Sequence, residues 1–206
     1  MAEQIDWLDQ WLTELDGKHP ADWALLPDIG LYMDQVQTFI DRQLGLYRRD
    51  DHERLLTPAM INNYIKDNLI PRAESKKYAP THLALLIIIG TLKQVLSIQN
   101  LNQLLSSYRD PADVAALYQH FLEVQRFSLR ENAAQVLAET AQLRQEIPAE
   151  GEPQADHATA LRNLALELSI EARTRILIAE RILTLLDQEK AGETSEKNER
   201  KKDKGK

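Results

Sequence analysis

Cysteine is absent from this chain of 206 residues. Its absence excludes disulfide bridges, thiolate metal sites and a cysteine nucleophile, and it is consistent with a reducing cytosol. Glycine and proline are scarce, at seven and eight residues, which argues against a turn-rich β fold. The most apolar run, residues 83–89, is too short to cross a bilayer, and the N-terminus has no signal-peptide pattern. We therefore predict a cytoplasmic, mainly α-helical protein that does not contact membranes.

The sequence also lacks the common motifs of catalysis. It contains no G-x-S-x-G sequence, no glycine-rich phosphate loop and no H-E-x-x-H pair. No histidine has another histidine three or four residues away, the spacing that suits a metal site on a helix. The five histidines are His19, His52, His82, His120 and His157. We predict no enzymatic activity, no cofactor and no metal; a helical enzyme with an enclosed pocket is an alternative that the sequence leaves open.

The net charge is −7, but the charge is distributed unevenly along the chain. Residues 1–41 carry one basic and nine acidic residues. Residues 42–109 carry ten basic and five acidic residues, and residues 110–206 carry fourteen and eighteen. The overall charge argues against nucleic acid as a partner, whereas a positive centre between acidic flanks is compatible with one.

The spacing of apolar residues divides the chain into four parts. Residues 1–25 contain an amphipathic helix, and residues 26–108 form a helical domain. Residues 109–188 are predicted to be a helical region for dimerisation or effector binding. Residues 189–206 contain almost no apolar side chain and mix both charges, so we predict a disordered tail.

The clearest helix boundaries lie in the middle of the chain. Thr57 is a good N-cap, and Pro58 suits the first helical position. A short helix follows, and we expect it to end at Asn68 in the left-handed conformation, before Pro71 forbids its continuation. Residues 72–78 are basic and long enough to form a β-hairpin wing.

Four further helices are predicted beyond this segment. Thr81 is expected to cap a helix that extends to about residue 96 and is apolar nearly all round, so that helix must lie at the centre of a core. Ser97 caps the next helix, and two longer helices cover about 112–146 and 158–188, joined by a linker. The last helix carries an apolar seam that requires a partner helix, in the same chain or in a second subunit. The seam consists of Leu161, Leu164, Leu168, Ala172, Ile176, Ala179, Leu183 and Leu186.

This order of helices and basic hairpin resembles the MerR winged helix-turn-helix. Residues 60–71 occupy the place of the MerR recognition helix and its exit, and residues 76–78 that of the wing, which ends in tyrosine. More closely, residues 26–108 are similar to a bacterial family of domains of unknown function, DUF1836. The similarity is carried by Leu26-Pro27-Asp28-Ile29, Tyr32-Met33-Asp34-Gln35-Val36, Met60-Ile61-Asn62-Asn63-Tyr64 and Leu92-Lys93-Gln94-Val95-Leu96-Ser97-Ile98. The resemblance implies a mainly α fold: a MerR-like winged helix-turn-helix core with a small β-hairpin wing, an N-terminal helix and a C-terminal helical hairpin.

Two departures from the MerR pattern bear on recognition. Asn62 and Asn63 stand where MerR regulators have arginine and tyrosine, and the segment before the recognition helix is longer than a tight helix-turn-helix allows. Asparagine is nevertheless able to pair with adenine in the major groove or to bind phosphate. The residues predicted to contact DNA are Asn62, Asn63 and Lys66 on the short helix, Arg72, Lys76 and Lys77 on the wing, and Arg48, Arg49 and Arg54 in the preceding connection.

The resemblance and the charge pattern together predict a transcription regulator that binds double-stranded DNA. We expect a homodimer joined through the C-terminal seam, because one winged helix grips few phosphates. An unidentified small-molecule effector would fit between the two C-terminal helices and the core. The alternative is a protein–protein interaction module, derived from a winged helix that no longer binds DNA. Such a module would use the seam or the N-terminal helix with Trp7 and Trp11.

Overall fold

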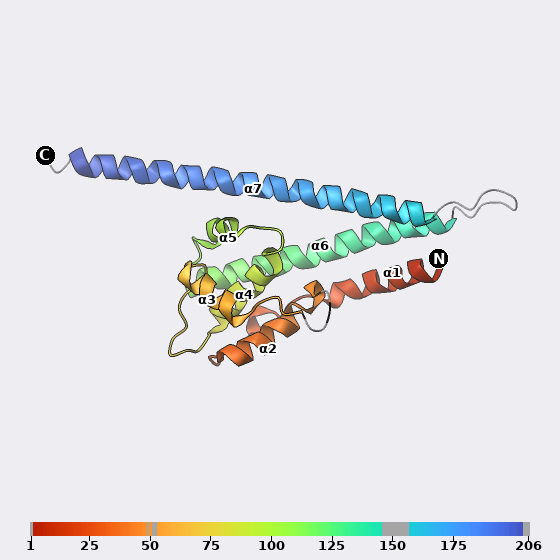
Figure 1. The fold of residues 1–206 in the computed structure, drawn as a ribbon, viewed down its shortest axis with the longest axis horizontal. Helices are drawn as coiled ribbons and strands as arrows, with labels where there is room; N and C mark the ends of the chain where they lie inside the picture. The colour runs from red at the N-terminus through yellow and green to blue at the C-terminus, as the bar shows by residue number, and fades with distance from the viewer. Residues whose placement is uncertain (1, 49, 51–52, 146–156, 204–206) are drawn as a thin grey trace, which may run out of the picture.

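The computed structural model describes residues 2–48, 50, 53–145 and 157–203. Figure 1 shows a long central helix, α6, with α1 beside its C-terminal half, α7 along its other side and α2–α5 gathered near its N-terminus. Among the described helices, none combines the length and the apolar character that a membrane span requires. The α-helices are α1 Ala2–Glu14, α2 Met33–Gln43, α3 Pro58–Lys66, α4 Pro80–Leu92, α5 Ile98–Leu105, α6 Pro111–Gln145 and α7 His157–Asp203. Short 3-10 helices cover Leu15–Gly17, Trp23–Leu25 and Gly45–Tyr47.

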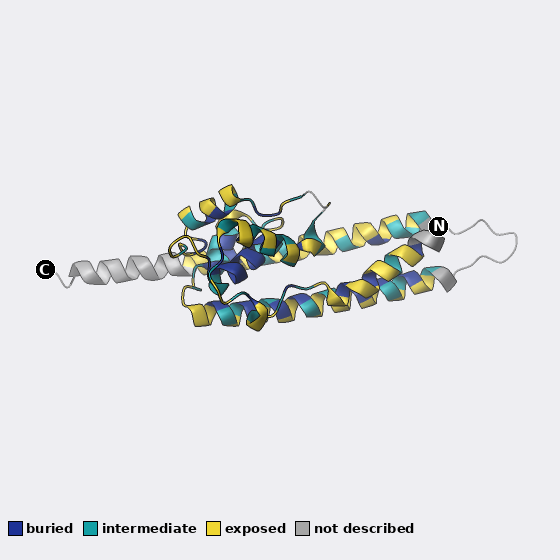
Figure 2. Ribbon diagram, turned by 90° about the horizontal axis from the view of Figure 1, so that it is seen from below, coloured by how far each residue is buried: buried dark blue, intermediate teal, exposed yellow. Residues whose placement is uncertain are grey.

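Helix α4 is the centre of the main core, as its composition predicted. Every residue from His82 to Gly90 is buried, so the helix has no solvent-facing side over this length. Buried side chains of α2, α3, α5 and the first half of α6 surround it, and Figure 2 shows this buried centre beside the more exposed long helices. Gly90 lets α2 approach closely, since a Cβ at this position would collide with the side chain of Leu44.

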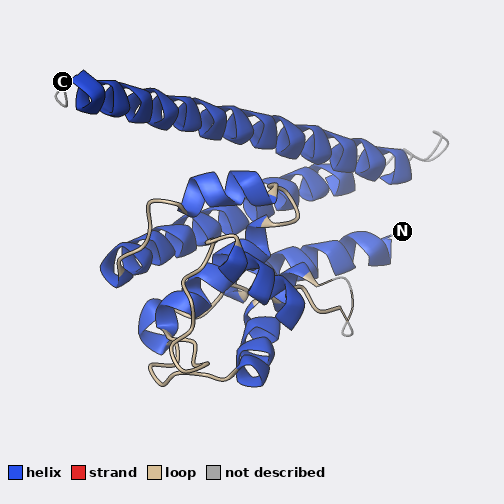
Figure 3. Ribbon diagram, turned by 60° about the vertical axis from the view of Figure 1, so that its left-hand side comes forward, coloured by secondary structure: helices blue, strands red, loops and turns tan. Residues whose placement is uncertain are grey.

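The predicted β-hairpin wing is wrong. Within the described residues, helices are joined by loops without any strand (Figure 3), and only two isolated β-bridges occur, Leu31 with Tyr78 and Glu74 with Lys77. The second bridge closes a two-residue turn, in which the N–H of Lys77 donates to the carbonyl of Glu74 at 2.8 Å and Ser75 and Lys76 have φ of 49° and 64°. Because Tyr78 pairs with the distant Leu31, the segment has no second strand of its own with which to extend a hairpin.

Helix ends agree with the sequence in three places and differ in one. The Thr57 hydroxyl accepts the N–H of Met60, the Ser97 hydroxyl accepts the N–H of Asn100, and Asn68 has a φ of 56°. Thr81, however, caps nothing, since α4 already begins at Pro80. The next residue, His82, provides the cap: its Nδ1 accepts the N–H of Ala79 at 3.0 Å.

The C-terminal helices extend away from the main core. A second, smaller cluster joins α1, α6 and α7 through Leu12, Leu15, Ala133, Val136 and Leu164, and α7 then passes along α5. Of the predicted linker at 147–157, residues 147–156 lie outside the described residues, and His157 is the first residue of α7. The predicted disordered tail is helical in backbone through Asp203; its sequence is rich in lysine and glutamate, which are good helix formers.

Candidate nucleic-acid interface

Helix α3 presents one face to the core and the other to solvent. Ile61 and Tyr64 are buried, and burial raises the pKa of the Tyr64 phenol. Asn62, Asn63 and Lys66 are exposed, as the sequence predicted. Asn62 and Lys66 stand one helical turn apart, so both side chains are available to a ligand on the same side of the helix.

The basic side chains in and before the two-residue turn after α3 are exposed, although the turn does not belong to a β-hairpin. Arg72, Lys76 and Lys77 are all exposed. The Lys77 ammonium lies 5.7 Å from the centre of the Tyr32 ring, in cation–π contact. Type I′ geometry, with two positive φ angles, turns the chain sharply and thereby places Lys76 at its tip.

A groove of about 720 Å³ brings the two predicted segments together. Asn62 of α3 lines it with Arg72 and Lys76 of the turn, across from the N-terminal residues of α2. Its lining also includes the carboxylate of Asp34 and the apolar side chain of Met33. The groove therefore combines amide and cationic groups with one opposing charge.

Comparison with known proteins identifies the region that carries this groove. Residues 21–121 match the family model described as Domain of unknown function (DUF1836). The match supports the similarity seen in the sequence and extends beyond 26–108, into α6. Comparison with curated proteins and with solved structures gave no match. The DUF1836 description names a family and assigns no activity to it.

The remaining predicted contacts lie apart from the groove of the DUF1836 region. Arg54 is exposed and Arg48 is half-buried, in the connection between α2 and α3, and neither lines the groove. The Nε of Arg48 donates to the carbonyl of Asp50 at 3.3 Å. Arg49 lies outside the described residues. The structure thus unites Asn62 with Arg72 and Lys76 but does not bring the arginines of the connection to them.

The C-terminal end of α3 is held by residues that the sequence did not single out. The Arg109 guanidinium donates to the carbonyl of Asn68 at 2.7 Å, and the Asn102 amide donates to the carbonyl of Asp67 at 3.1 Å. Both bonds satisfy carbonyls that a helix end leaves without partners. They connect positions 41 and 35 residues apart, respectively, so no local sequence pattern could have revealed them.

The described residues contain no candidate metal centre. In that part of the chain, histidine and carboxylate side chains form no group of three or more that could hold an ion. Burial lowers the pKa of His82, and the nearby main chain of Arg72 and charge of Glu74 only oppose that effect. His82 is thus favoured in its neutral form, with Nδ1 as the acceptor and the proton on Nε2.

Proposed function

We propose that the DUF1836 domain binds double-stranded DNA as a MerR-like regulator of transcription, with α3 in the major groove. The observation that carries the proposal is the shared groove, in which Asn62 of α3 lies with Arg72 and Lys76 of the adjoining turn. A short helix with an exposed amide and lysine, flanked by a cationic turn, offers base contacts and phosphate contacts side by side.

The polar side chains suit distinct parts of the duplex. The amide of Asn62 can donate to N7 and accept from N6 of adenine, a pairing that reads one base pair. Lys66 and Lys76 are exposed cations that suit phosphate oxygens. The short turn reaches less far than a β-hairpin would, so its lysines serve the backbone next to α3 rather than a distant minor groove.

A homodimer would contain two copies of α3 and its adjoining turn, one for each half of a DNA site. Helix α7 carries seven apolar side chains that are 48–59% exposed, of which only Leu186 belongs to the predicted seam. They are Leu166, Ile170, Leu177, Ile178, Ile182, Leu185 and Leu186. Exposed apolar side chains along a long helix are stabilised by packing on another helix, and a second copy of α7 offers the same apolar residues in return.

An interaction module without DNA contact is the second candidate, and α1 favours it. Trp7 is 66% exposed and Trp11 is 38% exposed, although large aromatic side chains usually find a partner surface. The carboxylate of Asp34 in the groove and the net charge of −7 favour the same alternative. In this case α1 or α7 would carry the binding surface, and α3 would serve only to cap the core.

DNA binding is tested by fluorescence anisotropy with mixed genomic duplex fragments, from low to moderate salt. Wild-type protein should bind with a strong salt dependence. The double variant Lys76→Glu/Lys77→Glu should bind at least tenfold more weakly, and its log–log salt slope should be smaller by about two, one for each lost phosphate contact. Arg175→Glu, an exposed charge reversal on α7, is the matched control and should bind like wild type.

Assembly is measured on the same proteins by light scattering after gel filtration. A dimer of this 23.6 kDa chain is expected, and Leu177→Glu should convert it to monomer while Arg175→Glu does not. A folded, dimeric protein that fails to bind DNA even at low salt would rule out DNA binding for the free protein and favour the interaction module. A monomer at high concentration would rule out the homodimer.

A further inference from the structure

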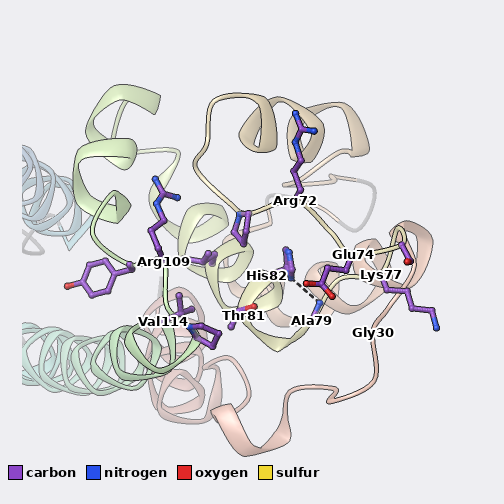
Figure 4. A pocket seen from close by; sticks show the side chains of 14 residues that line it. Gly30, Arg72, Glu74, Lys77, Ala79, Thr81, His82, Arg109 and Val114 are labelled. Carbon is purple, nitrogen blue, oxygen red and sulfur yellow. Dashed lines mark hydrogen bonds between the residues drawn. The ribbon is translucent and has the colours of Figure 1, made fainter.

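Two exposed apolar surfaces lie on α1 and α7, away from the cavity at the starts of α4 and α6. That cavity has a volume of about 630 Å³. In it the Glu74 carboxylate lies beside His82, whereas the guanidinium groups of Arg72 and Arg109 point away from His82 (Figure 4). Such a mixture of charges favours no single class of ligand. The surfaces of α1 and α7, in contrast, are each bordered by charge of one sign.

Helix α1 has apolar side chains on two sides, and the chain itself covers only one of them. Ile5 and Leu12 are buried on the side that packs against α6. Trp7 and Trp11 lie one helical turn apart on another side, where they are 66% and 38% exposed. Tryptophan is enriched among the residues that carry most of the binding energy of protein interfaces. Because other residues already hold α1 to the core, the tryptophan pair is available to a partner of the folded chain.

Helix α7 carries an apolar stripe on its outer side, formed by Leu166, Ile170 and Leu177. These three residues recur at helical spacing and are 50–59% exposed. At 3.6 residues per turn they point about 140° away from Leu164, which is buried in the cluster with α1 and α6. We call these three residues the outer stripe. It faces solvent in the single chain and has the length of two to three helical turns needed to receive another helix.

The outer stripe is distinct from the side of α7 that suits pairing with a second α7. Ile178, Ile182 and Leu185 are spaced by four and three residues, which is the spacing of a coiled-coil seam. They are turned from the outer stripe by about 100° around the helix. One neighbouring helix covers only one side of α7, so a second α7 on this seam leaves the outer stripe for a further element.

Charge complements the apolar match between α1 and the outer stripe. Helix α1 contains four acidic residues and no basic residue. On α7, exposed Arg162 lies one turn before Leu166, and exposed Arg173 follows Ile170 by three residues. Arg173 has an ion pair within α7, to Glu180 at 3.7 Å, and its side chain is still 61% exposed. A guanidinium group both pairs with carboxylates and stacks on the ring of tryptophan, so these arginines suit both kinds of side chain that α1 exposes.

We propose that α1 of one copy docks on the outer stripe of α7 in a second copy, with Trp7 and Trp11 against Leu166 and Ile170. The proposal rests on the homodimer of the proposed function and adds a second contact to it. Figure 1 shows α1 and the first half of α7 at the same end of α6, where the smaller cluster joins them. In a two-fold dimer the contact therefore forms twice, once from each copy.

Tryptophan fluorescence of the full chain tests whether the pair becomes covered. Trp23→Phe retains an aromatic ring beside Tyr118 and leaves Trp7 and Trp11 as the only tryptophans. Quenching by acrylamide is measured above and below the concentration at which the dimer dissociates. The quenching constant should be at least twofold smaller in the dimer. A dimer whose tryptophans are quenched as strongly as those of the monomer would overturn the proposal and leave pairing through α7 standing.

The dissociation constant of the dimer, measured by sedimentation, tests the residues in contact. Trp7→Ala should raise it at least tenfold, whereas Phe127→Ala, which removes a 67% exposed ring from α6, should not change it. Arg162→Glu should weaken the dimer, and Arg175→Glu, on the opposite side of α7, should not. Equal dissociation constants for Trp7→Ala and Phe127→Ala would contradict the proposal.

A double-mutant cycle shows whether α1 and the outer stripe touch each other. Ile170→Ala should add little to the loss already caused by Trp7→Ala, because both variants remove the same contact. Ile182→Ala lies outside the outer stripe, and its effect should multiply with that of Trp7→Ala. Multiplying effects for Ile170→Ala as well would overturn the contact. A monomer at every concentration would refute this contact and the homodimer together, whereas a dimer with covered tryptophans that does not bind DNA would refute only the DNA-binding function.

Discussion

The helical domain around α4 and the long C-terminal helix α7 bury their apolar side chains to different extents. Around α4, nine consecutive residues are buried, and neighbouring helices cover them on every side. On α7, only Leu164 and Leu183 are buried among the described side chains, while seven apolar side chains are about half exposed. The domain completes its core within one chain, whereas α7 has apolar surface left for a partner. Folding and assembly therefore depend on different residues and can be broken separately.

The largest expected effect comes from truncating a side chain of α4. Leu86 is fully buried, and Leu86→Ala should lower the free energy of unfolding by about 2–5 kcal/mol through lost contacts and a residual cavity. Leu177→Ala on α7 removes the same atoms from a half-exposed position and should cost less than about 0.5 kcal/mol in the monomer. Urea unfolding at low protein concentration measures both. Equal losses would show that α7 is as well packed as α4.

A smaller effect is expected at Gly90 of α4, which lies against the C-terminal end of α2. A Cβ at Gly90 would collide with Leu44, so Gly90→Ala should destabilise the domain by about 1–3 kcal/mol, although alanine is the better helix former. At Gly45, nothing lies within 4 Å of an added Cβ, and Gly45→Ala serves as the control. Thermal unfolding of the two variants compares them directly. A stabilised Gly90→Ala protein would mean that the two helices can separate without loss.

Local sequence signals predicted most of the helices, and a distant pairing accounts for the error at the wing. Thr57 and Ser97 cap helices because a hydroxyl needs only an N–H three residues away. The prediction of a β-hairpin wing was wrong because Tyr78 pairs with Leu31, which is far away in the sequence. For the candidate site, exposure of Asn62 followed from helical periodicity. The support of α3 by Arg109 depends on tertiary packing and leaves no trace in the sequence.

A still smaller effect on stability is expected from removing the side chain that caps a helix. Thr57→Ala removes the acceptor of the Met60 N–H at the start of α3, so it should cost about 1 kcal/mol. Thr38→Ala changes an exposed threonine within α2 whose hydroxyl bonds only the carbonyl of Asp34, and it should be nearly neutral. Chemical unfolding measures both variants. If Thr57→Ala reduces the free energy of DNA binding by more than it reduces the free energy of unfolding, α3 contacts DNA as well as stabilising the fold.

The smallest effect concerns pH and His82, which is buried at the start of α4. Burial lowers the pKa of His82 below its ordinary value of 6.5, so the unfolded chain binds this proton more readily than the folded one. Stability from this residue is therefore fully present above about pH 6.5 and is lost as the pH falls through the folded-state pKa. His82→Gln retains an acceptor for the Ala79 N–H and removes the titration, so its unfolding free energy should fall less between neutral and mildly acidic pH. Parallel curves for the two proteins would show that the titration of His82 does not contribute to stability.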